Sequence, residues 1–119
     1  MGDSFVWSLK NGELEQVRKI VEAKGPEVIK KEIENGRMAL HFAADYGQTD
    51  VMEYLISKGA DVNQQDKHGI SPLLAAIWEG HTSCVKLLLE KGAKKDGKSP
   101  DGSRLIECAE TQDIKDLLK

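Results

Sequence analysis

Apolar residues along the chain fall into pairs of short segments with the three-to-four-residue spacing of one helix face. The best-formed pair lies between Gly69 and Ala93. Its first segment is rich in small residues, begins at Pro72 and breaks at Gly80-His81, and its leucine-rich second segment stops at Gly92. Proline suits the first helical turn because its missing N–H has no intrahelical acceptor there, and glycine suits a helix exit. The pattern therefore predicts two short helices separated by a break.

The same skeleton occurs 33 residues earlier in the chain. The paired positions are Gly69 and Gly36, Leu73 and Leu40, Ala76 and Ala43, Gly80 and Gly47, and Gly92 and Gly59. A divergent pair of segments precedes these two copies, and a last pair, trimmed by four residues, follows them. We expect a single domain of about four units, approximately residues 4–34, 35–67, 68–100 and 101–119. The linker from Pro26 to Asn35 is the least regular part, with one extra loop residue.

A single helix pair cannot bury its own apolar stripe, whereas several stacked pairs form a continuous core. The sequence therefore predicts an all-α solenoid of about four stacked helix pairs with turn or hairpin connections. Ala43-Ala44 and Ala75-Ala76 would let the first helices of neighbouring units approach closely. Trp7 aligns with Phe42 and Ala75, so we expect its ring to pack in the core.

Composition narrows the function classes. The chain has 20 acidic and 17 basic residues, a net charge of −3, which argues against a nucleic-acid partner but permits a basic protein surface. Cys84 and Cys108 lie in apolar helical context, so we expect buried free thiols in a reducing compartment, with a reactive or disulfide role as the alternative. No signal-peptide or membrane-spanning pattern is found, and we expect a monomer in the cytoplasm with passive access to the nucleus.

One segment matches a nucleotide-binding motif by its letters alone. The residues from Gly92 to Ser99 satisfy G-x-x-x-x-G-K-S. A working phosphate loop needs a buried strand before it and a helix directly after it. Here a helix is expected before the motif and a turn at Pro100-Asp101-Gly102 after it. We therefore interpret Gly92 as a helix cap, and a nucleotide-binding enzyme is the less favoured alternative.

No other residue group indicates chemistry. The histidines have no second ligand at a metal-binding spacing, and no nucleophile, base and acid fall into a catalytic grouping. Asp61 and Asp66 flank a turn and most simply accept hydrogen bonds from backbone N–H groups. We expect no enzyme activity, no cofactor and no metal.

The 33-residue period, with Gly69-x-Ser71-Pro72-Leu73, Gly80-His81 and Gly59-Ala60-Asp61-Val62-Asn63, resembles the ankyrin-repeat family. Unit three has Leu74 where the repeat usually has histidine, and unit two has Met38-Ala39 in place of Thr-Pro. The resemblance implies an ankyrin α-solenoid. It also implies that His41 and His81, at consensus positions, hydrogen-bond the backbone.

In an ankyrin stack, the turn tips and the exposed ends of the inner helices form one concave surface, which we call the inner strip. Aromatic anchors surrounded by charge are typical of interface hot spots, so we expect Tyr46 and Trp78 to lie exposed there, with packing over a neighbouring unit as the alternative. Arg37 and Ile70, at one repeat position, should project from the strip. Glu34, Asp45, Asp66 and Glu79 should make it acidic. The candidate protein-binding residues are Glu34, Arg37, Asp45, Tyr46, His68, Ile70, Trp78 and Glu79, with Asn35 and Lys67 beside them at the tips.

A closer resemblance is carried by Leu9-Lys10-Asn11-Gly12, Asp66-Lys67-His68, Glu79-Gly80-His81 and Ser83-Cys84-Val85-Lys86. This combination is similar to a family of small proteins that consist of ankyrin repeats alone. That resemblance implies a protein-binding module that binds the heterodimeric actin capping protein and sterically inhibits its capping of filament barbed ends. The alternative is an ankyrin-type regulator of a kinase or a transcription factor, because one scaffold serves many partners.

Overall fold

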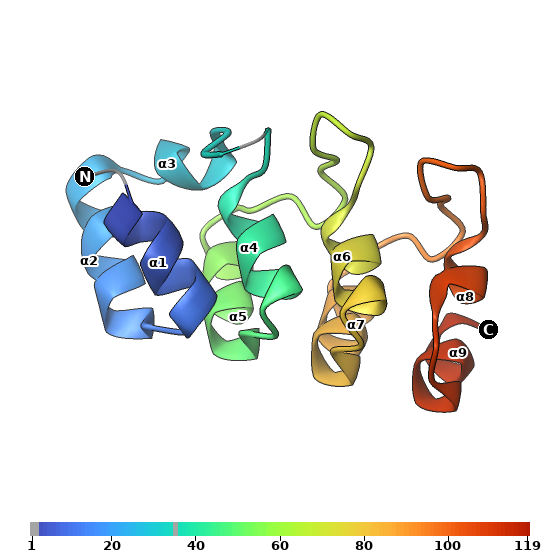
Figure 1. Cartoon of the computed structure of the whole chain (residues 1–119). Coiled ribbons are helices and arrows are strands. Elements are labelled where there is room, and N and C mark those ends of the chain that lie inside the picture. Colours follow the sequence, from blue (N-terminus) through green and yellow to red (C-terminus); the bar gives the residue numbers. More distant parts are fainter. Residues whose placement is uncertain (1–2, 35) are drawn as a thin grey trace.

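The computed structural model describes residues 3–34 and 36–119, which form a row of helix pairs (Figure 1). Its helices are α1 (Asp3–Asn11), α2 (Leu14–Lys24), α3 (Glu27–Lys30), α4 (Ala39–Asp45), α5 (Thr49–Ser57), α6 (Pro72–Trp78), α7 (Thr82–Glu90), α8 (Leu105–Cys108) and α9 (Gln112–Leu118). Within the described ranges the only β-type pairings are two isolated bridges, Glu34 with Arg37 and Lys98 with Arg104. The all-α prediction is confirmed. None of the helices is long and apolar enough to cross a membrane, as far as the described residues extend.

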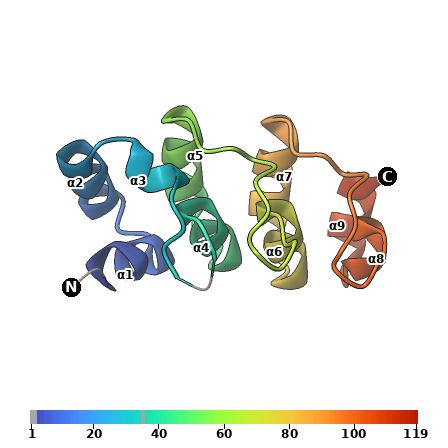
Figure 2. The ribbon, with the colours of Figure 1, turned by 90° about the horizontal axis from the view of Figure 1, so that it is seen from above.

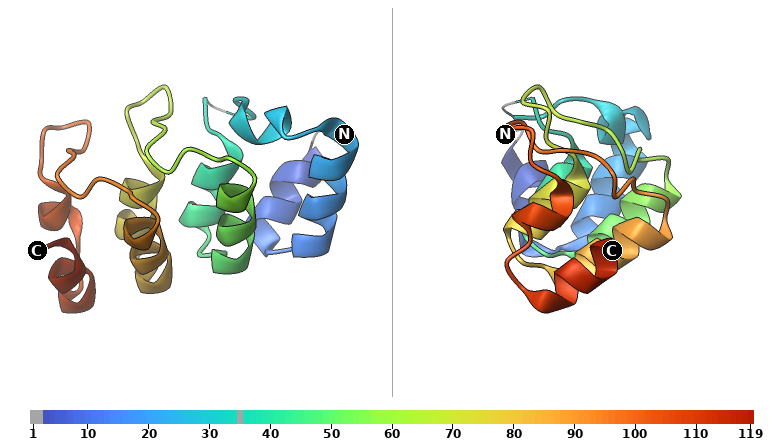
Figure 3. Two further views of the ribbon diagram at one scale, coloured as in Figure 1. Left: turned by 180° about the vertical axis from the view of Figure 1, so that it is seen from behind. Right: turned by 90° about the vertical axis from the view of Figure 1, so that its right-hand side faces the viewer.

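The helices form two rows that run along the 40 Å axis of the molecule (Figure 2). The inner row contains α1, α4, α6 and α8, and the outer row contains α2, α5, α7 and α9. Loops rise together from one side of the stack, while the breaks within each pair lie on the opposite side (Figure 3). Each pair packs on the next, as expected of a solenoid.

Local signals at α6 explain why the best repeat folds as it does. Ser71 is the N-cap residue, and its hydroxyl accepts a hydrogen bond from the Leu74 N–H at 3.1 Å. Pro72 follows at the first helical position, where it sacrifices no hydrogen bond. At the end of α7, Gly92 adopts a φ of +99°, which is strained for residues that carry a Cβ. The interpretation of Gly92 as a helix cap is confirmed.

The core lies between the two rows. The alanine pairs Ala43-Ala44 and Ala75-Ala76 are buried where inner helices meet, and Leu88 of α7 is fully buried. Small side chains leave room for the inner helices to pack closely, while larger ones from the outer row fill the space behind them. The stack therefore buries a continuous apolar core from its first unit to its last.

Two parts of the chain depart from the repeat: the linker after α2 and the last unit. The linker expected to be an irregular loop instead contains α3, whose Ile29 is buried with 1% of its surface exposed. Ile29 belongs to the apolar core, and α3 packs against α2 and α4. The last unit is trimmed, and α8 has only four residues.

Candidate functional site

Tyr46 and Trp78 lie where the two central inner helices end. Tyr46 follows the last residue of α4, and Trp78 is the last residue of α6. Each is closely followed by a break glycine, Gly47 or Gly80, with a φ of +73°. The chain turns away at these glycines, which leaves both rings at the surface, with 46% of Tyr46 and 45% of Trp78 exposed. The expected exposure is confirmed.

Trp78 lines a shallow groove of about 230 Å³ between the two central units. The groove is formed by residues of α4 and the tip before it, of α6, and of the loop between α5 and α6: Arg37, Asp45, Asp66, His68, Ile70, Ala75 and Trp78. Ala75 is small and buried in the lining of this groove, and the exposed indole of Trp78 borders the hollow. A flat aromatic next to a hollow can receive an apolar side chain of a partner.

Tyr46 contacts the first unit through Lys10 of α1. The Lys10 ammonium lies 5.4 Å from the centre of the Tyr46 ring and 5.7 Å from that of Phe42. This geometry is a cation–π contact. The contact keeps the Lys10 ammonium, a basic group, at the end of the inner strip where Tyr46 lies. Nothing in the sequence pattern indicates that Lys10 lies over these rings.

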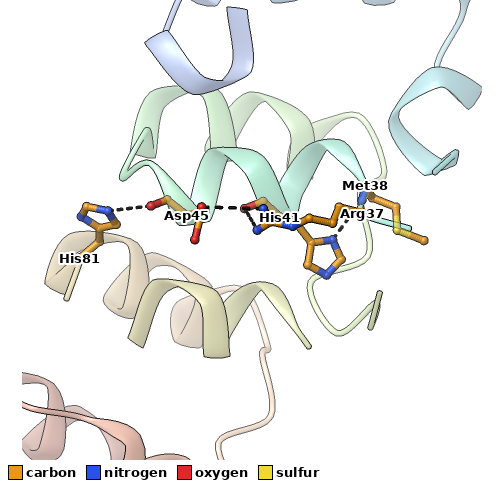
Figure 4. Close-up of polar contacts among 5 residues, drawn as sticks. All are labelled: Arg37, Met38, His41, Asp45 and His81. Atoms are coloured by element: carbon orange, nitrogen blue, oxygen red, sulfur yellow. Dashed lines mark hydrogen bonds and ion pairs between the residues drawn. The ribbon is translucent and has the colours of Figure 1, made fainter. Parts of the chain in front are cut away.

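Arg37 and Asp45 form an ion pair that crosses the inner face of α4 (Figure 4). Arg37 Nη1 lies 3.7 Å from Asp45 Oδ2, and Nη2 donates to the His41 carbonyl at 3.4 Å. The guanidinium also lies 4.8 Å from the centre of the Phe42 ring. The expectation that Arg37 projects from the strip is wrong, because these three contacts hold it against α4. The charge of Asp45 is partly neutralised by the same pair.

Asp66 does not contribute to an acidic surface. Its side chain is buried, and Oδ1 accepts hydrogen bonds from the N–H groups of His68 at 2.8 Å and Ile70 at 3.0 Å. The expected backbone bonding is confirmed, and the expected acidic contribution to the strip is wrong. This tie shapes the turn, so that His68 is exposed at the tip while Ile70 is half-buried. The projection expected of Ile70 is therefore only partial.

Glu34 and Glu79 are the exposed acids of the candidate set. Glu79 follows Trp78 at the end of α6, and Glu34 lies at the tip formed by residues 34–37, where its carbonyl accepts from the Arg37 N–H at 2.9 Å. Lys67 is exposed on the neighbouring tip. Asn35 lies outside the described residues. The acidic character of the strip thus rests mainly on two glutamates rather than on four carboxylates.

Two histidines connect the central units (Figure 4). His41 is fully buried; Nδ1 accepts from the Met38 N–H at 3.2 Å, and Nε2 donates to the Ile70 carbonyl at 2.8 Å. Burial lowers the pKa of His41 below its ordinary value of 6.5. His81 Nε2 donates to the Asp45 carbonyl at 2.9 Å. The expected backbone bonding of both rings is confirmed.

Trp7 is not a core residue. It is 56% exposed, although it aligns with the buried Phe42 and Ala75. The ring of Phe42 lies under Lys10 of the preceding unit, and Ala75 lines the groove shared with α4. This repeat position therefore faces the preceding unit. No unit precedes α1 in the described residues, so Trp7 has nothing to cover it.

The segment from Gly92 to Ser99 forms a loop and a turn. It follows helix α7, and Ser99 is buried with its hydroxyl hydrogen-bonded to the carboxylate of Asp101. This bond is the largest cause of the lowered pKa of Asp101. The Ser99 N–H donates to the Ser103 carbonyl at 2.9 Å, and α8 begins only at Leu105. The local geometry is a hairpin turn rather than a strand, loop and helix.

Neither cysteine is paired, and Cys84 is buried while Cys108 is only half-buried. Burial raises the pKa of the Cys84 thiol to about 11, which keeps it protonated and unreactive near neutral pH. The Cys108 Sγ contacts the Arg104 carbonyl at 3.5 Å. The expectation of full burial is thus confirmed for Cys84 and wrong for Cys108. Over residues 3–34 and 36–119, no three His, Cys, Asp or Glu side chains gather as a metal site would require.

Comparison with known proteins identifies the repeat. A family model described as ankyrin repeats, in three copies, matches residues 5–99. The chain belongs to the ankyrin-repeat family. It is also 52% identical to myotrophin of Xenopus tropicalis over 119 residues, which is 99% of this chain and 99% of that protein. The ankyrin repeats here therefore form a myotrophin-like protein-binding module that extends over nearly the whole relative.

Other ankyrin proteins are more distant. Protein phosphatase 1 regulatory subunit 27 of Mus musculus is 31% identical over 97% of this chain and 73% of that protein. The 26S proteasome non-ATPase regulatory subunit 10 of Dictyostelium discoideum is 39% identical over 76% of this chain and 39% of that protein. The ankyrin scaffold is thus shared among proteins whose names describe different assemblies, so the scaffold alone does not identify the partner.

Proposed function

We propose that the chain binds the heterodimeric actin capping protein and sterically inhibits its capping of filament barbed ends, so that more ends are free to grow. The proposal extends the myotrophin-like character of the chain to the partner implied by the sequence resemblance. In this proposal the chain performs no catalysis and acts as a monomer in the cytoplasm, with access to the nucleus.

The observation that carries the proposal is the pair of exposed aromatics at the ends of α4 and α6. Tyr46 and Trp78 are large, nearly half exposed, and lie at the ends of helices whose other residues are buried, except for the half-buried Asp45. An anchor held on a rigid helix end loses little conformational entropy when a partner covers it. Glu34 and Glu79 would lie opposite basic groups of the partner and speed the encounter.

The direct test is elongation of pyrene-labelled actin from seeds capped with capping protein. Adding the chain at a saturating concentration should restore barbed-end growth, because the bound module would cover the surface that capping protein uses on the filament. If growth remains capped at saturation, the proposal is wrong.

Trp78→Ala tests the anchor. The substitution should weaken binding of capping protein by at least about 2 kcal/mol, as expected of a central aromatic, while the thermal midpoint of the chain changes little. Binding is measured by titration calorimetry and stability by thermal denaturation. A large loss of stability would show instead that Trp78 serves the fold.

A charge-matched pair of variants tests the acidic contribution. Glu34→Gln with Glu79→Gln should slow association and reduce its dependence on salt. Glu53→Gln with Glu90→Gln removes the same charge from the outer helices, where both residues are exposed, and should leave association unchanged. Equal effects of the two pairs would assign the slowing to net charge alone.

The second candidate is a regulator of a kinase or a transcription factor that uses the same strip, because one scaffold serves many partners. The names of two relatives describe regulatory subunits of enzyme assemblies. A chain that leaves capped filaments unchanged, yet still loses affinity for another partner on Trp78→Ala, would support this candidate.

A further inference from the structure

A cavity of about 260 Å³ lies away from the inner strip, between α3 and the loop that follows α5. Its apolar wall is formed by Ile29, Met38, Leu40, Ala60 and Pro72, and its polar lining by Lys30, His41, Gly59, Asp61 and Gln64. Ile29 and Lys30 belong to α3, the helix that replaces an irregular linker. The departure from the repeat is therefore also what gives this cavity one of its walls.

The next junction of the stack contains the equivalent cavity, of about 220 Å³. Lining positions correspond at the 33-residue period: Lys30 with Asn63, Met38 with Ser71, Asp61 with Lys94, Gln64 with Gly97, and Pro72 with Leu105. The first cavity has an apolar wall where the second is mostly polar. The two cavities thus occupy equivalent positions in the repeat but are lined by different kinds of side chain.

The Asn63 side chain closes the second cavity by donating one hydrogen bond and accepting another. Its Nδ2 donates to the Gly92 carbonyl at 3.3 Å, and its Oδ1 accepts from the Lys94 N–H at 2.9 Å. Lys30 stands at the equivalent position of the first cavity and has donors but no acceptor. Among the described residues, the Asp61 N–H, which corresponds to that of Lys94, accordingly has no hydrogen-bond partner.

The Lys30 side chain lines the same cavity as Asp61 and reaches Gly59, two residues before it. It lies so near Gly59 that a Cβ built on that glycine would be 3.7 Å from Lys30 Nζ. Within the described parts of the chain, no carboxylate lies within ion-pair distance of Lys30. The Asp61 carboxylate is turned to its own loop, where Oδ1 accepts from the Asn63 N–H at 2.9 Å. The lining of the cavity therefore includes Lys30 and Asp61, each with a donor that has no acceptor among the described residues.

We propose that this cavity binds a small apolar carboxylate. The apolar body enters between Ile29, Met38 and Pro72, and the carboxylate accepts hydrogen bonds from the Lys30 ammonium and the Asp61 N–H. Both nitrogens of His41 are already bonded to the backbone, so the imidazole forms part of the wall and takes no part in recognition. The site is independent of the inner strip and of the partner proposed for it.

The test uses 3-phenylpropionate as the probe and 3-phenyl-1-propanol as its neutral counterpart. In ¹H–¹⁵N correlation spectra of the labelled chain, the acid should cause saturable shifts confined to the amides around the cavity, including Gly59, Asp61 and Gln64. The alcohol should bind about tenfold more weakly, because it lacks the charge that strengthens both hydrogen bonds.

Three variants decide the assignment. Lys30→Met should weaken binding of the acid about tenfold and leave that of the alcohol unchanged, whereas Lys31→Met, an exposed neighbour that does not line the cavity, should change neither. Ala60→Leu should block both probes by filling the cavity, and dispersed spectra would verify that this variant folds. Shifts that do not saturate, equal binding of acid and alcohol, or equal effects of Lys30→Met and Lys31→Met would overturn the proposal.

Discussion

The junction between α4 and α6 differs from the junction between α6 and α8, although both follow the same repeat. At the first, His41 and His81 donate to carbonyls of the neighbouring unit, at Ile70 and Asp45. At the second, the buried Leu74 stands at the position of His41 and has no donor, and α8 is only four residues long. The second junction is tied instead by the Asn63 amide.

The difference shows that apolar packing continues along the stack while the polar contacts change from these central units to the last one. The His81 bond to the Asp45 carbonyl lies where α4 and α6 end, beside Tyr46 and Trp78, and the His41 bond to the Ile70 carbonyl joins the starts of the same two helices. The two bonds together fix the spacing of the helices that present the candidate anchors. The last unit carries neither anchor and is held by a shorter interface. The two hydrogen bonds from buried or half-buried histidines thus lie between the units that carry the candidate site.

The largest expected effect comes from the apolar packing itself. Leu88→Ala should cost about 2–5 kcal/mol of the free energy of unfolding, because Leu88 is fully buried in α7 and the space would not refill. Leu117→Ala in α9 should cost less, since Leu117 is only half-buried. Urea denaturation measures both. A loss within about 0.5 kcal/mol for Leu88→Ala would contradict the stacked core.

His41→Leu should have the next largest effect. The substitution gives α4 the residue that α6 already has, but it leaves the Met38 N–H without its acceptor and removes the donor to Ile70. The expected cost is about 1–3 kcal/mol, again by urea denaturation. Leu74→Met, at the equivalent position in α6, is the control and should cost less. Equal costs would show that the imidazole contributes only volume.

His81→Ala should have a smaller effect, about 0.5–1.5 kcal/mol, because it removes one hydrogen bond at a half-buried position. His81→Gln should retain most of the stability. Gln48 stands at the same repeat position and donates to the Lys10 carbonyl at 2.8 Å. If the glutamine variant is as unstable as the alanine variant, the tie depends on the imidazole ring rather than on a donor.

The smallest expected effect is a dependence of stability on pH. Because burial lowers the pKa of His41, the unfolded chain binds the proton more readily than the folded chain does. The contribution of the neutral His41 side chain to the free energy of unfolding is therefore complete above pH 6.5 and is lost as the pH falls below that value. Unfolding measured between about pH 7.5 and 5.5 should show a steeper fall for the wild type than for His41→Leu. If the stability of the wild type and of His41→Leu falls equally with pH, the pH dependence does not come from His41.

The spacing of the glycines was sufficient to predict most of the fold. Gly47, Gly80 and Gly92 have positive φ at helix breaks or ends, so a side chain there would strain the backbone. Glycine therefore recurs in the sequence at the spacing of the repeat. Burial of the alanine pairs followed from the same register, because a position that packs in one unit packs in the next when its neighbour is present.

Register alone could not give the environment of each side chain. Trp7 shares its repeat position with Phe42, yet it is exposed because no unit in the described residues lies before it. Arg37 folds onto Asp45 eight residues later, a contact that depends on rotamers and on the length of α4. The linker formed α3 because Ile29 could be buried, and the four residues of that helix are too few to show a period.

The equivalence of Gln48 and His81 has a consequence for how such chains diverge. Both side chains reach the carbonyl near the end of the preceding inner helix, one by an amide and the other by an imidazole. Selection at this position can therefore act on the reach of a donor rather than on the identity of a residue. The units can therefore diverge in sequence while the spacing between them is kept. New binding surfaces can then evolve on the same scaffold.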